Sequence, residues 1–191
     1  MSTWLVVPTR GDHPQLLSGI ARLPYPLVVV RTAPCEVPES AHVIDDRGPV
    51  NIHRWWNAGL DYAQANGATV AVVLNDDVLV PPDAIGEMVD RLRDAGAWLC
   101  GADPTAMTGW AWALDLTAGE RPDERFCWWY GDNDLWRRAA DAGRLTGVNV
   151  GIAHQHPNQA TAASPELQRL AAEDMHTYQS KWEAACSPFS C

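Results

Sequence analysis

The first 100 residues alternate short apolar runs with amphipathic stretches, and this alternation constrains the fold more than any other feature of the sequence. Apolar, β-branched runs predict strands over residues 4–9, 27–31, 41–44 and 70–74. Helical spacing of apolar residues predicts helices over residues 14–23, 52–66 and 82–96, and glycines end the last two. Strands that alternate with helices are typical of a doubly wound, parallel α/β sheet, which binds its ligands at the carboxyl ends of its strands.

The second half is less regular but suits the same single domain. Strands are predicted over residues 97–101, 110–116 and 147–153, and helices over residues 132–142 and 165–183. A chain of 191 residues with 47% apolar and 20% charged residues can bury a sizeable core. No segment approaches the roughly 20 apolar residues of a membrane span, and no basic region precedes the first apolar run. The cytoplasm is therefore the expected location.

Charge and cysteine content exclude several classes of function. With 14 Lys and Arg against 24 Asp and Glu, the net charge of −10 disfavours a broad surface for nucleic acid or anionic membranes, although arginines in the second half leave a local basic rim open. Five cysteines without a CxxC pair indicate reduced thiols rather than disulfides or a zinc site. Ten tryptophans must mostly form core, yet some could line a sugar site, since the flat face of a hexose packs on an indole ring.

Three polar clusters follow predicted strands or open a predicted helix, at residues 75–77, 132–134 and 154–156. Each has a plain structural explanation: a turn, acids at a helix N-terminus, and a hydrogen-bonded histidine. Together they supply what transfer from a nucleotide sugar requires. A divalent cation on the diphosphate would be held by Asp77, and a carboxylate that deprotonates the acceptor hydroxyl would be Asp132.

Three further segments carry motifs. Val7-Pro8-Thr9-Arg10 ends the first predicted strand, Trp56-Asn57-Ala58-Gly59-Leu60 lies in the helix over 52–66, and residues 126–143 read FCWWYGDNDLWRRAADAG. In this order, the motifs resemble the family-2 glycosyltransferases of the GT-A fold over nearly the whole chain, in a compact form of phage or bacterial type. The resemblance implies an α/β fold with a Rossmann-like, mostly parallel central sheet flanked by helices.

The resemblance also assigns roles. Domain 1–191 would comprise a nucleotide-sugar-binding half, 1–100, and an acceptor and catalytic half, 101–191. Residues 75–77 replace the family's Asp-x-Asp motif, with Asn75 at the first position, and Gly131 stands where the family has a glutamate before the catalytic aspartate. The implied site residues are Pro8, Thr9, Arg10, Asn57, Asn75 and Asp76 for the nucleotide; Asp77 and His154 for the metal, with His156 as the alternative histidine; Asp132 as the base; Trp110, Trp112, Trp129 and Asp134 for acceptor or sugar; and Lys181 for phosphate.

The implied activity is that of a metal-dependent, inverting, hexosyltransferase-like enzyme that uses Mn²⁺ or Mg²⁺. It would move a sugar from a nucleotide-diphosphate sugar to a hydroxyl on a glycan, a protein or a modified DNA base. A nucleotidyltransferase stays open as an alternative, although Thr9 to Asp12 lack the glycine-rich, lysine-bearing loop that would favour it. The other alternative is a nucleotide- or sugar-binding module without turnover. Asn75 and Gly131, the two departures from the family's motifs, favour this alternative.

Overall fold

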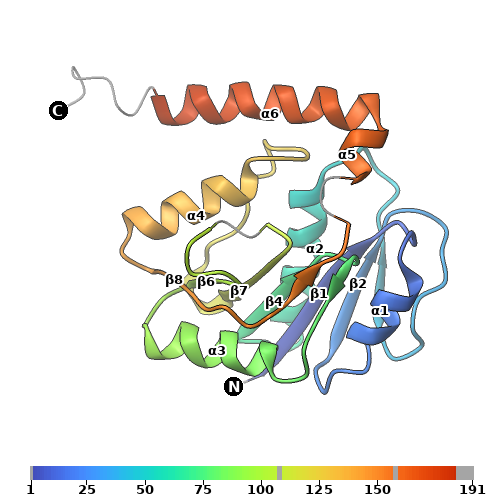
Figure 1. Cartoon of the computed structure of the whole chain (residues 1–191), viewed down its shortest axis with the longest axis vertical. Coiled ribbons are helices and arrows are strands. Elements are labelled where there is room, and N and C mark those ends of the chain that lie inside the picture. Colours follow the sequence, from blue (N-terminus) through green and yellow to red (C-terminus); the bar gives the residue numbers. More distant parts are fainter. Residues whose placement is uncertain (1, 107–108, 157–158, 184–191) are drawn as a thin grey trace.

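The computed structural model describes residues 2–106, 109–156 and 159–183. Its centre is a seven-stranded sheet in the order β3-β2-β1-β4-β7-β6-β8 (Figure 1). The strands are β1 (Thr3–Thr9), β2 (Leu27–Arg31), β3 (His42–Asp45), β4 (Val70–Leu74), β6 (Leu99–Gly101), β7 (Ala111–Asp115) and β8 (Leu145–Gly147). All neighbours pair in parallel except β7, which runs antiparallel to β4 and β6. The predicted mostly parallel sheet is confirmed, with one reversed strand that the apolar pattern did not reveal.

Helices cover both faces of this sheet. They are α1 (Pro14–Ile20), α2 (Ile52–Ala65), α3 (Ala84–Asp94), α4 (Gly131–Asp141), α5 (Gln159–Ala163) and α6 (Pro165–Glu183), with a 3-10 turn at Leu116–Ala118. Alternate residues of β1 point to opposite faces: Leu5 belongs to the core cluster under α1 and α3, and Val6 to the cluster under α2 and α4. The long helix α6 runs past the outer side of α4 (Figure 1).

Local sequence explains how α2 is placed. The side chain of Asn51 caps its first turn by accepting a hydrogen bond from the backbone N–H of Arg54 at 2.8 Å. Gly67, at a φ of +88°, follows its last turn as the sequence predicted. Within the helix, a Cβ at Gly59 would overlap the side chain of Val6 on β1. The glycine therefore lets α2 pack directly against the central strand, which fixes the start of α2 beside the ends of β1 and β4.

The prediction of one strand over residues 147–153 is wrong, and the difference matters for the site. Strand β8 ends at Gly147, and β9 (Ala153–His154) forms a separate antiparallel pair with β5 (Val78–Leu79). Gly151, at a φ of +67°, interrupts the apolar alternation that suggested a continuous strand. In the β5–β9 pair, His154 lies opposite Val78, so the chain delivers this histidine next to the end of β4.

Two findings bear on the sequence-based classification. Cys35, Cys100 and Cys127 are free thiols. Within the described residues, none of the helices combines the length and the apolar character that a bilayer crossing requires.

Candidate active site

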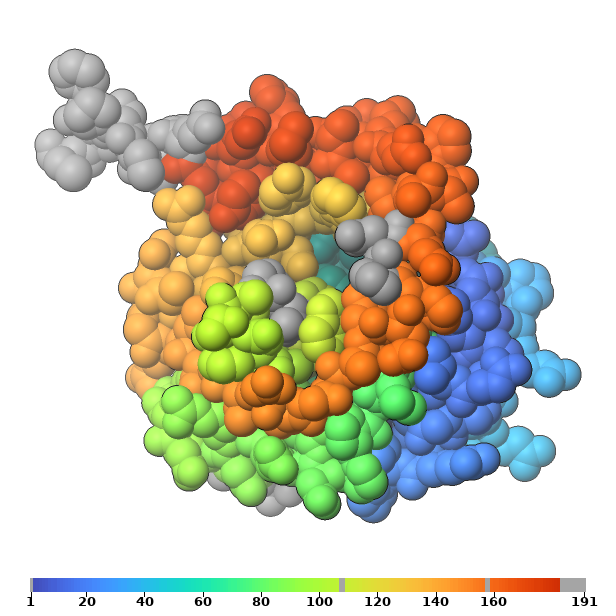
Figure 2. Space-filling view, viewed as in Figure 1, coloured from blue at the N-terminus to red at the C-terminus, as the bar shows by residue number. Residues whose placement is uncertain are grey.

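A cleft of about 520 Å³ opens at the carboxyl ends of β1 and β4. On this side the molecular surface is visibly hollowed between the yellow segment before α4, the lime segment after β6 and the orange segment around β9 (Figure 2). The predicted site residues that line the cleft are Pro8, Thr9, Arg10, Asn75, Asp76, Asp77, Trp110, Trp129, Asp132, His154 and His156. The fold thus brings all three polar clusters of the sequence to one cavity.

Asp77 and His154 form the candidate metal centre. Nε2 of His154 lies 3.0 Å from Oδ2 of Asp77, and the Trp110 ring stacks on the imidazole with a centroid separation of 5.7 Å. Oδ1 of Asp77 and Oδ1 of Asn75 are buried without a hydrogen-bond partner. A buried, unpaired carboxylate oxygen is costly, and a divalent cation next to His154 would satisfy that of Asp77. The residues present therefore fit such an ion.

The protein alone offers few ligands. Across residues 2–106, 109–156 and 159–183, no group of three or more His, Cys, Asp or Glu side chains could hold a metal ion. Magnesium is commonly held by one or two carboxylates, with substrate phosphates and water at its other positions. The Asp77 and His154 pair suits a cation that binds together with a phosphorylated ligand.

Asp76 links the loop after β4 to the loop after β1. Oδ2 of Asp76 accepts a hydrogen bond from the Thr9 hydroxyl at 2.5 Å, and the Thr9 oxygen accepts one from the backbone N–H of Gly11 at 2.9 Å. Burial raises the pKa of the Asp76 carboxyl, while the bond from Thr9 opposes this shift. The loop after β1 and the loop after β4 are thus held together at the floor of the cleft.

Asp132 lies in the first turn of α4. Its Oδ1 accepts a hydrogen bond from the N–H of Asn133 at 2.9 Å. A Cβ at position 109 would overlap Oδ2, so only a glycine there leaves this oxygen clear. Burial raises the pKa of Asp132 above its ordinary value, which brings a carboxylate closer to the basicity that proton abstraction from a hydroxyl needs.

His53 is a residue that the sequence analysis missed. It is fully buried beneath the start of α4, and its Nδ1 donates to the carbonyl of Phe126 at 2.8 Å, because a carbonyl can only accept. Nε2 has no partner, and burial lowers the pKa of the ring. A Cβ at Gly131 would overlap Nε2. His53 therefore occupies the space that a side chain at position 131 would need. This overlap explains why the family's glutamate is replaced by a glycine here.

The aromatic loop, residues 127–130, forms the wall of the cleft before Asp132. Asp174 on α6 is buried and accepts hydrogen bonds from the three backbone N–H groups of residues 127–129, at 2.9, 2.7 and 2.9 Å. The indole N–H of Trp128 donates to the Thr161 hydroxyl at 2.7 Å. Tyr130 has a φ of +64°, a conformation rare for a non-glycine residue. Asp174, also missed from the sequence as a site residue, holds this loop from a helix far along the chain.

Asn57 and Trp112 do not line the cleft, contrary to the roles predicted for them. The amide of Asn57 donates to the carbonyl of Pro122 at 3.0 Å and to the carboxylate of Glu124 at 2.8 Å, which uses both of its hydrogens. Trp112 is 2% exposed and packs edge-on against Trp56 in the core. Asn57 therefore fastens the loop before α4, and Trp112 contributes to packing.

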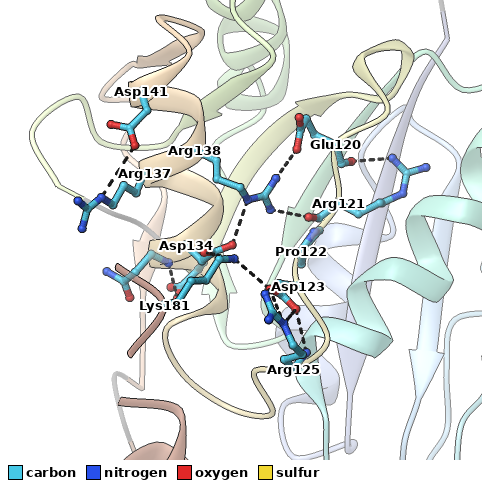
Figure 3. A network of polar contacts seen from close by, with 12 residues as sticks. Glu120, Arg121, Pro122, Asp123, Arg125, Asp134, Arg137, Arg138, Asp141 and Lys181 are labelled. Atoms are coloured by element: carbon cyan, nitrogen blue, oxygen red, sulfur yellow. Dashed lines mark hydrogen bonds and ion pairs between the residues drawn. The ribbon is translucent and has the colours of Figure 1, made fainter. Parts of the chain in front are cut away.

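Asp134 and Lys181 do not line the cleft, and they belong to a polar network between α4 and residues 120–125 (Figure 3). The Lys181 ammonium is 2.6 Å from Asp134 and 3.0 Å from Asp123, and Arg138 lies 3.0 Å from the other Asp134 oxygen. Hydrogen bonds from Arg125 and then Lys181 hold the pKa of Asp123 below its usual value. Lys181 on α6 thus forms an ion pair with Asp134 on α4. It does not make the phosphate contact that the sequence predicted.

Comparison with solved structures identifies the fold. Glucosyl-3-phosphoglycerate synthase from Mycobacterium tuberculosis, crystallised with Mn²⁺, UDP-glucose and phosphoglyceric acid, matches with a TM-score of 0.63 at 15% identity over 94% of this chain and 79% of its own. Residues 1–349 of Staphylococcus aureus TarS match with a TM-score of 0.60 at 10% identity, over 91% of this chain and 65% of that fragment.

A putative nucleotide-diphospho-sugar transferase from Desulfovibrio desulfuricans matches with a TM-score of 0.53 at 12% identity, over 93% of this chain and 99% of its own. No protein-family model and no curated protein sequence matches the chain. The chain therefore has the GT-A fold found in nucleotide-sugar transferases, at sequence identities that establish the fold alone.

Proposed function

We propose that the protein is a metal-dependent, inverting glycosyltransferase that moves a sugar from a nucleoside-diphosphate sugar to an acceptor hydroxyl. The observation that carries this proposal is the meeting of the Asp77 and His154 pair with Asp132 in one cleft of a GT-A fold. A fold hosts many activities, so the proposal depends on these side chains.

The donor end of the cleft is formed by the loops after β1 and β4. Pro8, Thr9 and Arg10 would bind the nucleotide base, and Asn75 with Asp76 would bind the ribose. Asp77 and His154 would hold Mn²⁺ or Mg²⁺, as their unpaired oxygen and adjacent imidazole allow. When bound, the cation would stabilise the negative charge that grows on the diphosphate leaving group. One similar structure contains Mn²⁺ with UDP-glucose, which supports this choice of metal and donor class.

The acceptor end is centred on Asp132. Its carboxylate would take the proton of the acceptor hydroxyl, and the oxygen so activated would attack the anomeric carbon on the face opposite the diphosphate. Direct displacement of this kind inverts the anomeric configuration. Residues 1–100 would supply most of the donor end and residues 101–191 the acceptor end. His154 is an exception, because the β5–β9 pair carries it across to the donor end.

The test is donor binding and turnover with and without Mn²⁺. UDP, UDP-glucose and UDP-GlcNAc should raise the melting temperature only when Mn²⁺ is present, since a ligand that binds the folded state stabilises it. Release of UDP from a sugar donor should follow the same metal dependence. Asp77→Asn should remove both effects. Asp83→Asn is the matched control, because Asp83 follows the same loop, is exposed and caps nothing with its side chain.

The outcomes separate the rival functions. Metal-dependent stabilisation without any release of UDP, with or without acceptors, would indicate a binding module on the same fold. Stabilisation by nucleoside triphosphates alone, with release of pyrophosphate, would favour a nucleotidyltransferase. Either result would contradict the glycosyltransferase.

A further inference from the structure

The charge distribution of the cleft is markedly one-sided. Four lining carboxylates belong to Asp12, Asp76, Asp77 and Asp132, whereas Arg10 is the only lining Lys or Arg among the described residues. Arg10 follows β1, at the donor end. Among the described residues that line the acceptor end, no lysine or arginine accompanies Asp132.

Two other positive side chains, Lys181 and Arg138, form ion pairs outside the cleft. Lys181 forms ion pairs with Asp123 and Asp134, and Arg138 with Glu120 and Asp134 (Figure 3). These contacts hold Lys181 and Arg138 outside the lining of the cleft. A phosphate or carboxylate on an acceptor would meet the Asp132 carboxylate with no lysine or arginine among the described lining residues at that end, and such like-charge contacts are strongly unfavourable in a partly buried site.

The acceptor end instead offers aromatic rings and neutral hydrogen-bonding groups. Trp129 is 39% exposed and lines the cleft beside Tyr130, together with Asn133 in the first turn of α4. The aromatic loop is fixed from behind by the three bonds to Asp174, so its rings are ordered before a ligand arrives. An aromatic face packs well on the apolar face of a sugar ring, and amides can bind its hydroxyls.

Resting on the proposed function, we propose that the acceptor is an uncharged saccharide that packs on the Trp129 and Tyr130 rings beside Asp132. Acceptors that carry phosphate, sulfate or carboxylate at the acceptor end, and nucleic acids, are excluded by the charge of the cleft. This selects the glycan among the acceptor classes that the sequence left open.

The experiment is a glycan array probed with the labelled full-length protein in the presence of UDP and Mn²⁺. The array pairs neutral oligosaccharides with sialylated, sulfated and phosphorylated counterparts. Bound glycans should be neutral, and an added anionic group near the bound terminus should weaken binding by at least about tenfold. Trp129→Ala should weaken neutral binding about tenfold or more, and Trp129→Tyr by much less. Val43→Ala, at an exposed apolar residue on the edge strand β3, is the control.

A charge-gain variant sharpens the test. Asn133→Arg places a cation beside Asp132 and should reverse the discrimination against anionic glycans. Binding confined to anionic glycans, equal binding of both sets, or no glycan binding at all would overturn the proposal. Stabilisation by UDP and Mn²⁺, measured on the same samples, shows whether the proposed function still stands in each case.

Discussion

The two ends of the cleft are built in different ways. At the donor end, Asp76 and Asp77 directly follow β4, and Thr9 ends β1, so the sheet itself positions them. At the acceptor end, Asp132 and the aromatic loop depend on contacts from distant segments: His53 on α2, Thr161 on α5 and Asp174 on α6. The donor end is thus a product of neighbouring strands, whereas the acceptor end depends on the last helix of the described chain.

This difference makes the two ends separable by mutation. A change at the end of β4 should affect nucleotide and metal binding without moving the aromatic loop. A change on α6 should loosen the aromatic loop while nucleotide binding persists. The predictions below test that separation, in order of decreasing effect.

Asp132→Asn should lower the rate of sugar transfer by about 10²–10⁴-fold, the usual contribution of a general base. The amide keeps the size of the carboxylate but cannot take the acceptor proton. Nucleotide affinity, measured by calorimetry with Mn²⁺, should change little, because Asp132 serves the acceptor end. A large loss of nucleotide affinity would show that Asp132 belongs to the donor end.

Asp77→Ala should behave in the opposite way. It removes a carboxylate that lies 3.0 Å from His154 and should weaken the Mn²⁺-dependent part of nucleotide binding by about 10–100-fold. Calorimetric titration of UDP with and without Mn²⁺ measures this part directly. Equal metal dependence in the variant and the wild type would count against the assigned metal centre.

Asp174→Asn should cost about 1.5–3 kcal/mol of unfolding free energy, because it replaces a buried anionic acceptor of three N–H groups. In transfer assays the acceptor KM should rise, while the affinity for UDP with Mn²⁺ stays near the wild-type value. Glu173→Gln is the control, since Glu173 is exposed and its carboxylate forms a surface ion pair with Arg169. Equal losses at both ends of the cleft would refute their separation.

Gly131→Ala should destabilise the protein by about 1–3 kcal/mol, because the new methyl group overlaps His53. If that overlap is the cause, the same substitution in a His53→Ala background should cost much less. A double-mutant cycle in urea measures the coupling between the two positions. Simple additivity would mean that His53 does not determine the glycine at position 131.

The smallest effect concerns pH. Since burial raises the folded-state pKa of Asp132, its contribution to stability is full below the pKa of the unfolded chain and is lost as pH rises through the folded-state pKa. Asp132→Asn should therefore have a higher melting temperature than the wild type at neutral pH, with the gap closing in acid. An unchanged gap between acidic and neutral pH would contradict the raised pKa.

The sequence predicted local structure well where local patterns suffice. Strands β2 and β4 and helix α6 have the predicted bounds, because β-branched runs and a Ser-Pro helix start define them. The sequence analysis also expected Asp77, Asp132 and His154 to share one site, and all three line the same cleft. The reversed direction of β7 and the short β5–β9 pair were not predictable, because strand direction and pairing depend on distant partners.

The site residues that were missed or misplaced share one cause. No site role was predicted for His53 or Asp174, because their roles arise from contacts with backbone groups far away in sequence. Lys181 was expected at a phosphate, yet it pairs with Asp123 and Asp134, which only tertiary packing brings within reach. The contact with His53 explains one feature that the sequence analysis did note, the glycine at position 131 where the resembling family carries a glutamate.

The most direct measurement is a crystal structure of the protein with UDP and Mn²⁺, with anomalous differences recorded at the manganese absorption edge. We predict one strong peak within bonding distance of Asp77 and His154, with the diphosphate completing the ligand sphere and the nucleoside over the ends of β1 and β4. A peak elsewhere, or bound UDP with no manganese beside Asp77, would contradict the assignment of this cleft to metal-dependent sugar transfer.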